Sequence, residues 1–215
     1  MIRIGITGHR PHRLILPEPR LARRVEKVLA SLHRAAGPGR RRRDPRLDIV
    51  SPLAEGCDRI VARAALGLGQ RLTVLLPFAR RDYEATFADP ATIPEFRRLL
   101  KAAHARTDLA ASPRHREAGY VAVGMATLAM SDIMLTIWDG KPAAGRGGTP
   151  EILENAIGWG IPVIWIDAAR DRPAVLLGAP RRAREGARLE AAARRATRWS
   201  AALARRVVAQ ISERD

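Results

Sequence analysis

Short apolar, β-branched runs alternate along this chain with segments of helical periodicity, and this alternation is the feature that most limits its fold. The runs occupy residues 3–7, 47–51, 72–76, 132–138 and 162–167. Strands that alternate with helices form parallel sheets that are covered by helices on both faces. We therefore predict an α/β protein with a Rossmann-like, doubly wound sheet, in which the five strands have the spatial order 3-2-1-4-5.

Apolar spacing and glycine stops place the helices between these runs. We predict helices at residues 18–33, from about 57 to 68, at 93–104, at 121–130, at 150–159 and at about 181–211. The 121–130 segment is almost wholly apolar, so we expect it to be buried. Residues 78–118 carry the weakest pattern; a lid, a substrate loop or a disordered connector are all compatible with it.

The chain is expected to divide into an α/β domain at residues 1–170 and a C-terminal addition at 171–215, a linker followed by one long amphipathic helix. That helix carries an apolar stripe, made of Leu189, Ala193, Ala196, Trp199, Leu203, Val207 and Ile211. Such a stripe packs on its own domain or on a partner subunit. With the apolar 121–130 segment, it predicts a homodimer or a higher homo-oligomer, most simply a two-fold dimer.

The net charge of +16 raises the question of a polyanionic partner. Only three of the 38 basic residues are lysines, and the arginines are spread over several predicted helices, although residues 40–43 are four consecutive arginines. Two tyrosines and three phenylalanines are too few for a platform that stacks bases. We favour a solvated basic surface and treat nucleic acid as the less favoured partner.

Other features exclude several classes of site. The single cysteine, Cys57, allows neither an internal disulfide nor a cysteine zinc site, and packing is its expected role. The apolar runs are far shorter than the ~20 residues that cross a bilayer, and the first residues predict a strand instead of a signal peptide. We expect a cytoplasmic protein with no membrane association, no metal cluster and no cofactor.

A glycine-rich loop follows the run at 132–138 and reads Gly145-Arg146-Gly147-Gly148-Thr149-Pro150-Glu151. A strand that ends in glycines and then opens a helix presents free backbone N–H groups to an anion. We expect Thr149 to be the N-cap, Pro150 the first helical residue and Glu151 part of the first turn. The segment is typical of a phosphate-binding loop with a carboxylate at its edge.

Other segments with candidate ligand-binding residues also follow predicted strands, at residues 7–10, 51–58 and 139–140. Ligands of doubly wound sheets bind outside the carboxyl ends of the strands, where the strand order reverses. The predicted ligand-binding set is therefore Gly8, His9, Arg10, Ser51, Ala54, Gly56, Asp58, Asp139, Gly140, Gly147, Gly148, Thr149 and Glu151.

Several of these residues have two interpretations. Arg10 offers a planar fork for phosphate or is a surface arginine, and His9 is a general acid or a local hydrogen-bonding group. Asp58 caps a helix or contacts a ligand hydroxyl. Asp139 accepts from a ribose or is a turn residue, and Glu151 is an acid/base or ribose-binding carboxylate or a first-turn residue.

Taken together, residues 4–10, 51–59, 75–78, 131–133 and 139–151 resemble the SLOG superfamily of Rossmann-like domains, over roughly residues 1–170. That superfamily includes the LONELY GUY phosphoribohydrolases, the DNA-processing protein A family and sensor domains of prokaryotic defence systems. The resemblance implies a nucleotide-like ligand at the glycine loop.

The match to the LONELY GUY signature is uneven. Residues 147–151 resemble the second half of its Pro-Gly-Gly-x-Gly-Thr segment, which puts Glu151 in the place of a functional carboxylate. The companion Met-His-x-Arg-Lys motif, which supplies a catalytic arginine, has no counterpart, and residues 119–124 stand in its place. Arg10 or Arg146 would have to supply that charge.

Three functions follow in order of preference. The first is a sensor-type domain that binds a nucleotide or a nucleotide derivative. The second is an N-glycosidic hydrolase of a nucleoside phosphate, with Glu151 and Arg10 as its catalytic residues. The third is a DNA-binding protein related to DNA-processing protein A.

Overall fold

The computed structural model describes residues 1–37, 46–141, 148–178 and 186–213. Within these residues the strands form one eight-stranded sheet with the order β4-β3-β2-β1-β5-β6-β7-β8. The strands are β1 (Ile2–Gly8), β2 (Leu47–Ser51), β3 (Arg71–Leu76), β4 (Ala105–Asp108), β5 (Ile133–Trp138), β6 (Val163–Asp167), β7 (Val175–Leu176) and β8 (Thr197–Arg198). The first six are parallel to their neighbours, and β7 and β8 are antiparallel.

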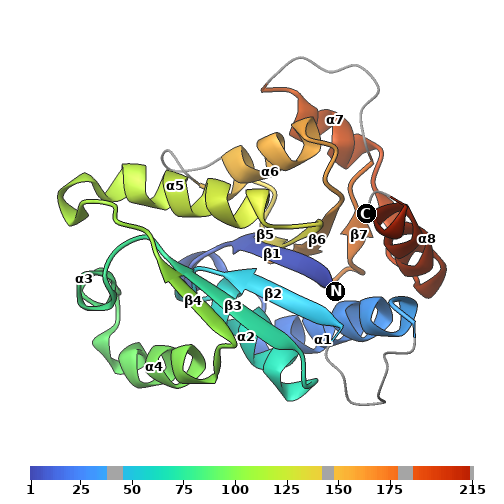
Figure 1. Cartoon of the computed structure of the whole chain (residues 1–215). Helices are drawn as coiled ribbons and strands as arrows, with labels where there is room; N and C mark the ends of the chain where they lie inside the picture. Colours follow the sequence, from blue (N-terminus) through green and yellow to red (C-terminus); the bar gives the residue numbers. More distant parts are fainter. Residues whose placement is uncertain (38–45, 142–147, 179–185, 214–215) are drawn as a thin grey trace.

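Helices cover both faces of the sheet (Figure 1). They are α1 (Glu18–Ala35), α2 (Cys57–Gly67), α3 (Arg80–Glu84), α4 (Ile93–Ala102), α5 (Arg116–Ala129), α6 (Thr149–Gly158), α7 (Arg188–Arg194) and α8 (Ala201–Ser212). Helices α5, α6 and α7 lie on one face, and α1, α2, α4 and α8 lie on the other. The main core fills the space between the sheet and α1 and α2, as two-sided burial of parallel strands requires.

The predicted Rossmann-like sheet is confirmed. The five predicted strands are β1, β2, β3, β5 and β6, and they lie in the predicted order within the larger sheet. The order reverses between β1 and β5, whose registers pair Thr7 with Thr136 and Gly8 with Ile137. Strand β4, which the sequence did not predict, is an edge strand whose four residues are all exposed, so no apolar alternation marks it.

The single helix predicted at about residues 181–211 is wrong. The structure has two helices there, α7 and α8, separated by β8, which pairs with β7. The Trp199 N–H donates to the Ala174 oxygen at 2.8 Å, and the Ser200 side chain caps α8 by accepting from Leu203 N. A C-terminal helix is nevertheless present: α8 packs on α1, and Trp199 Nε1 donates to Ser31 Oγ at 2.9 Å.

The apolar 121–130 segment is less buried than expected. It lies within α5, where Val123, Thr127 and Leu128 face the interior. Ala122 is exposed, and so is Met130 beyond the end of the helix. The reason is its place in the outer layer: α5 covers β1 and β3 from one side only, so its other side faces solvent.

Candidate ligand-binding site

A cavity of about 320 Å³ opens at the carboxyl end of β1, where the strand order reverses. The turn after β1, the loop between β2 and α2, Tyr83 of α3 and the start of α6 meet there, with α5 along one side. Its polar and glycine lining includes Thr7, Gly8, His9, Arg10, His12, Arg13, Asp58, Tyr83, Tyr120, Gly124, Gly148 and Thr149. This is the place where doubly wound sheets bind ligands, and the volume is at the lower end of the range for small-molecule sites.

Two glycines let the backbones around the cavity approach closely. A Cβ on Gly8 would lie 2.3 Å from Cys57 Sγ and 2.7 Å from the Ile137 oxygen. Gly56 has a φ of +89°, and a Cβ there would lie 2.6 Å from the His9 oxygen. The Cys57 N–H donates to that same oxygen at 3.0 Å. The start of α2 is therefore fixed directly against the end of β1.

His9 forms part of a buried chain of polar contacts behind the cavity. Its Nε2 lies 2.7 Å from Asp139 Oδ1, and Arg13 Nη2 donates to Asp139 Oδ2 at 2.8 Å. The Lys141 N–H also donates to Asp139 Oδ1, at 2.9 Å. Asp139 thus orients His9 from the end of β5, and Arg13 comes from the short helical turn Pro11–Arg13.

Opposing effects set the pKa values of this pair. Burial by itself would raise the pKa of Asp139, but hydrogen bonds from His9, the Lys141 N–H and Arg13 hold it at about 2. Burial lowers the pKa of His9 below its ordinary value, and the hydrogen bond and charge of Asp139 oppose that change only in part. At neutral pH, Asp139 is therefore a carboxylate and His9 is a neutral imidazole.

Asp58 faces the cavity from the first turn of α2. Its Oδ2 accepts from the Ala54 N–H at 3.1 Å and from Ser51 Oγ at 3.3 Å. Burial raises the pKa of this carboxyl to about 7, although these hydrogen bonds and the charges of Arg10 and Arg59 oppose the rise. A carboxyl group with such a pKa exchanges a proton near neutrality, a property that is common at functional sites.

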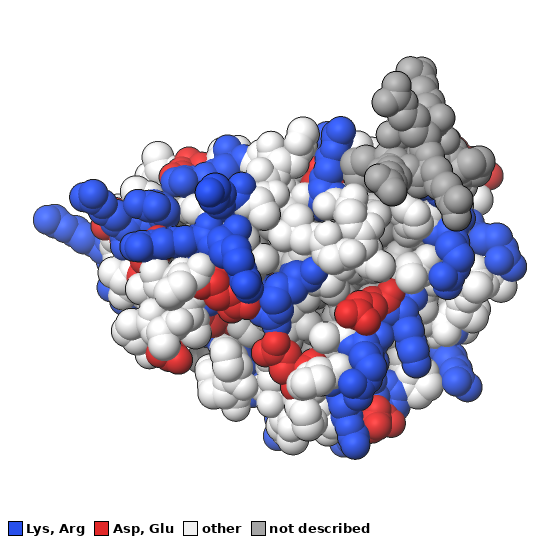
Figure 2. Space-filling view, turned by 90° about the horizontal axis from the view of Figure 1, so that it is seen from below, with Lys and Arg blue, Asp and Glu red and all other residues white. Residues whose placement is uncertain are grey.

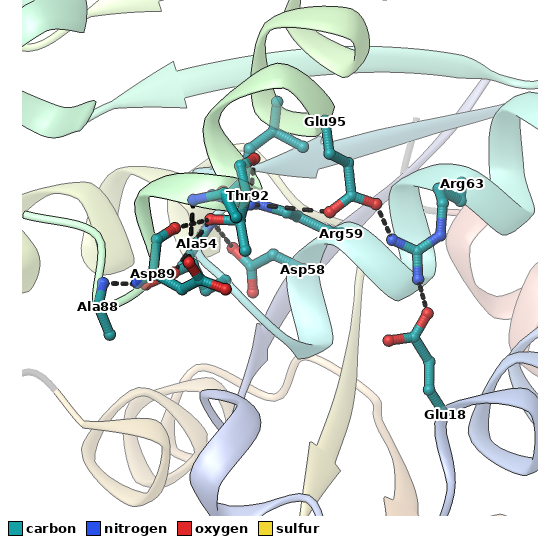
Figure 3. A network of polar contacts seen from close by, with 12 residues as sticks. Glu18, Ala54, Asp58, Arg59, Arg63, Ala88, Asp89, Thr92 and Glu95 are labelled. Carbon is teal, nitrogen blue, oxygen red and sulfur yellow. Dashed lines mark hydrogen bonds and ion pairs between the residues drawn. The ribbon is translucent and has the colours of Figure 1, made fainter.

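A closed polar network, which we define as Glu55, Arg59, Thr92 and Glu95, supports this wall from behind (Figure 3). Glu55 accepts from the N–H groups of Ala88 and Asp89 and from Thr92 Oγ1, at 2.9, 3.2 and 3.1 Å. Arg59 donates to the Thr92 oxygen at 3.0 Å and lies 3.7 Å from Glu95.

The same network holds a strained residue beside the cavity. Leu53 has a φ of +55°, which is unfavourable for a residue with a side chain. Arg59 Nε donates to the Leu53 oxygen at 3.2 Å, and the Leu53 N–H donates to Ser51 Oγ at 3.0 Å. These two bonds fix the turn that presents Ala54 and Asp58 to the cavity.

Arg10 is the half-exposed cation at the cavity mouth. Its Nη1 lies 3.3 Å from Glu55 Oε2, and its guanidinium carbon lies 5.7 Å from the centre of the Tyr120 ring. The fork is thus anchored at one end and partly open to solvent. Glu55 is buried but keeps three other hydrogen bonds, so Arg10 can turn toward an anion without leaving this carboxylate unpaired.

Helix α6 begins one residue earlier than the predicted cap implies. Its N-cap is Gly148, which has an extended backbone, and Thr149 is the first helical residue, so the prediction of Thr149 as N-cap and Pro150 as first residue is wrong. The difference arises because the Gly148 oxygen already accepts from Glu151 N and Ile152 N. The Thr149 N–H, at the start of the helix, points out of it without a partner within the helix.

The structure brings together seven members of the predicted binding set along one cavity. They are Gly8, His9, Arg10, Ala54, Asp58, Gly148 and Thr149. Ser51 is bonded to Asp58, and Asp139 is bonded to His9, both from behind the cavity. Gly56 lies in the turn before α2, directly against the His9 oxygen. Gly147, Arg146 and the four arginines at 40–43 lie outside the described residues.

Two members of the set line a different cavity. Gly140 and Glu151 belong to a hollow of about 670 Å³ beside Trp138 and Trp165. Sequence reasoning placed Glu151 and Arg10 in one crevice, whereas these two residues line separate cavities. It also missed Arg13, Glu55 and the tyrosines, although the chain has only two tyrosines and both line the first cavity.

Other kinds of site find less support in the described residues. Figure 2 shows lysines and arginines in separate groups on the face of α1, α2 and α4, with acidic side chains between them. Within the described ranges, no three His, Cys, Asp or Glu side chains are grouped as metal ligands would be. No described helix is long and apolar enough to cross a membrane.

Comparison with known proteins supports the fold. The X-ray structure of DNA processing protein A (DprA) from Streptococcus pneumoniae matches with a TM-score of 0.53 and 18% sequence identity. The match covers 80% of this chain and 54% of that one, so this chain spans about half the length of that protein. This chain has the Rossmann-like fold expected from the SLOG resemblance. No family model and no curated protein matches the sequence.

Proposed function

We propose that the cavity at the end of β1 binds a nucleotide or a nucleotide derivative. The observation that carries the proposal is the meeting, at the point where the strand order reverses, of the start of α6, an arginine fork and a buried carboxyl in one cavity. A helix start and an arginine suit a phosphate, and the buried carboxyl after β2 adds a further hydrogen-bonding group to the same cavity.

The aromatic side of the cavity suits the remaining part of such a ligand. Tyr120 lies beside the Arg10 guanidinium, and Phe78 holds its ring in an edge-on contact at 5.7 Å between ring centres. A planar base can stack on a ring that is fixed in this way. The volume of about 320 Å³ favours a mononucleotide over a dinucleotide.

The other functions have weaker support. Hydrolysis of an N-glycosidic bond through Glu151 and Arg10 requires the two side chains to act on one bond, and they line separate cavities. Binding of DNA would rely on the arginine surface, where the basic groups in Figure 2 alternate with acidic ones. A homodimer and a cytoplasmic location remain proposals, as does the division into a ligand-binding unit at 1–170 and a C-terminal addition.

A thermal-shift series with ribonucleotides and their derivatives tests the proposal. A specific ligand at a hundred times its dissociation constant adds about 2.7 kcal/mol to the free energy of unfolding, a shift of several degrees. We expect Arg10→Ala to lower the affinity at least about tenfold, the value of one charge-assisted contact. Arg20→Ala is the matched control, because Arg20 lies on α1 and pairs with Asp171, away from the cavity.

The proposal fails if no member of the series raises the melting temperature of the unmodified protein. It is also contradicted if a nucleotide binds equally well to the Arg10→Ala and Arg20→Ala variants, because the ligand would then lie elsewhere.

A further inference from the structure

Three almost fully buried side chains each turn an unpartnered polar atom toward the cavity. His9, Asp58 and Tyr83 are 5%, 4% and 1% exposed, and all three line it. Among the described residues, His9 Nδ1, Asp58 Oδ1 and Tyr83 Oη have no hydrogen-bond partner. None of the three atoms is among those of the described residues that lack both solvent contact and a hydrogen-bond partner. They therefore contact the solvent of the cavity.

The partner of His9 decides which form this histidine presents. Asp139 is an ionised acceptor, held by Arg13 and the Lys141 N–H, so His9 Nε2 must donate the hydrogen of the 2.7 Å bond. In the neutral ring, Nδ1 then carries a lone pair that faces the cavity. An anion cannot bond to that lone pair, but it can accept from Nδ1 once a proton has been added.

Asp58 poses the same problem for an anion from the start of α2. Ser51 and Ala54 use Oδ2, which leaves Oδ1 toward the cavity. As a carboxylate it would repel a phosphate, whereas as a carboxylic acid it is neutral and can donate. Burial raises its pKa to about 7, so the neutral form is within reach at physiological pH.

We propose that His9 and Asp58 form a proton-accepting pair, so that the cavity takes up protons together with a phosphate monoester. The inference rests on the proposed function and names the recognition chemistry of that site. Proton uptake at either residue makes the cavity more positive, which favours an anion. Tyr83 Oη adds a donor that does not depend on the proton.

Several other charged groups surround His9 and Asp58, but we assign the proton uptake to these two residues. His9 faces Asp139 from the residue after β5 and Arg13 and His12 from the turn after β1, and the start of α2, which carries Asp58, is bonded to its oxygen. Asp58 faces Arg10, Arg59 and Tyr83. Arg13 is paired with Asp139 and Arg10 with Glu55. His12 is exposed at the rim, and His104, which is exposed and does not line the cavity, serves as the control histidine.

Calorimetry with inorganic pyrophosphate and the four ribonucleoside 5′-monophosphates tests this inference. The full chain is titrated from about pH 6 to about pH 8, in two buffers that differ in ionisation enthalpy. Each coupled proton weakens binding about tenfold per pH unit across that range, after correction for the second ionisation of the phosphate itself. The difference in binding heat between the two buffers counts the protons taken up.

The variants assign the protons to residues. We expect His9→Gln to weaken binding and to remove one proton from the count, and Asp58→Asn to strengthen binding above about pH 7 and to flatten its pH dependence. His104→Gln should retain the proton uptake of the unmodified protein. The ring Cε1–H signal of His9 in NMR should report a higher pKa with the probe bound than without it.

Each outcome separates the inference from the proposed function. Nucleotide binding without proton uptake, or uptake that survives in both the His9→Gln and Asp58→Asn variants, overturns the inference alone. Pyrophosphate binding with proton uptake, but with no nucleotide bound, overturns the proposed function alone. If no probe binds and the His9 signal is unaffected by every probe, both are overturned.

Discussion

Two polar clusters share helix α2, and they differ in whether their unpaired atoms face solvent. In the closed polar network, Glu55 accepts four hydrogen bonds. Arg59 is bonded to two backbone oxygens (Figure 3), and its Nη2 is sealed from solvent without a hydrogen-bond partner among the described residues. On the cavity side, His9, Asp58 and Tyr83 each keep one polar atom toward solvent. A ligand can reach the unpaired atoms of the open cluster but not those of the closed network, so the closed network is suited to hold the structure and the open cluster to bind a ligand.

The largest effect that would sharpen this contrast is expected for Glu55→Ala. The change removes a buried carboxylate and leaves the N–H groups of Ala88 and Asp89 without their acceptor. We expect the free energy of unfolding in urea to fall by about 2–4 kcal/mol. Glu18→Ala is the control, because Glu18 pairs with Arg63 at the surface and its loss should cost less than about 1 kcal/mol. Equal losses would remove the distinction.

The next effect has the opposite sign and depends on pH. The pKa of Asp58 is raised to about 7 in the folded protein from 3.8, so the folded state holds a proton that the unfolded state lacks. The stability of the protein therefore falls as pH rises from about 4 to about 7 and stays low above it. We expect Asp58→Asn to stabilise the protein by about 1–3 kcal/mol at pH 8 and by much less at pH 4. Melting curves at both values check this, and a variant that is less stable at pH 8 would contradict it.

The smallest stability change is expected for Tyr83→Phe. The ring packs against Phe78, Phe87 and Phe96, and the substitution keeps these contacts while removing a hydroxyl that has no partner among the described residues. The free energy of unfolding should change by less than about 0.5 kcal/mol, whereas ligand affinity should fall several-fold. A destabilisation above about 1.5 kcal/mol would place this hydroxyl in the structural cluster instead.

The sequence predicted those parts of the fold that apolar periodicity controls. Strands β1, β2, β3, β5 and β6 are largely buried on both faces, so they appear as mostly apolar runs, interrupted by Arg3 in β1 and by Asp48 in β2. The strand order followed from the preference for right-handed crossovers. Strands β7 and β8 are only two residues long, and the pairing of Thr197–Arg198 with β7 overrides the helical pattern on both sides.

The candidate site was predictable where residues follow strands in the sequence, as at Gly8, His9 and Arg10. It was not predictable where distant segments supply side chains. Tyr83 comes from α3, in the segment with the weakest pattern, and reaches the cavity only through the packing of aromatic rings. Asp58 was predicted, but its proton affinity follows from burial, which sequence spacing does not reveal.

The open edge at β4 has a consequence for how copies of this protein behave at high concentration. The strand presents unpaired backbone groups along one side of a sheet, an arrangement that invites strands of other molecules to join and to grow into aggregates. Arg106 and Asp108 belong to this short strand and form an ion pair with each other. A second strand that docked there would have to strip water from this ion pair. Two charged side chains thereby protect a sheet that could otherwise extend from molecule to molecule.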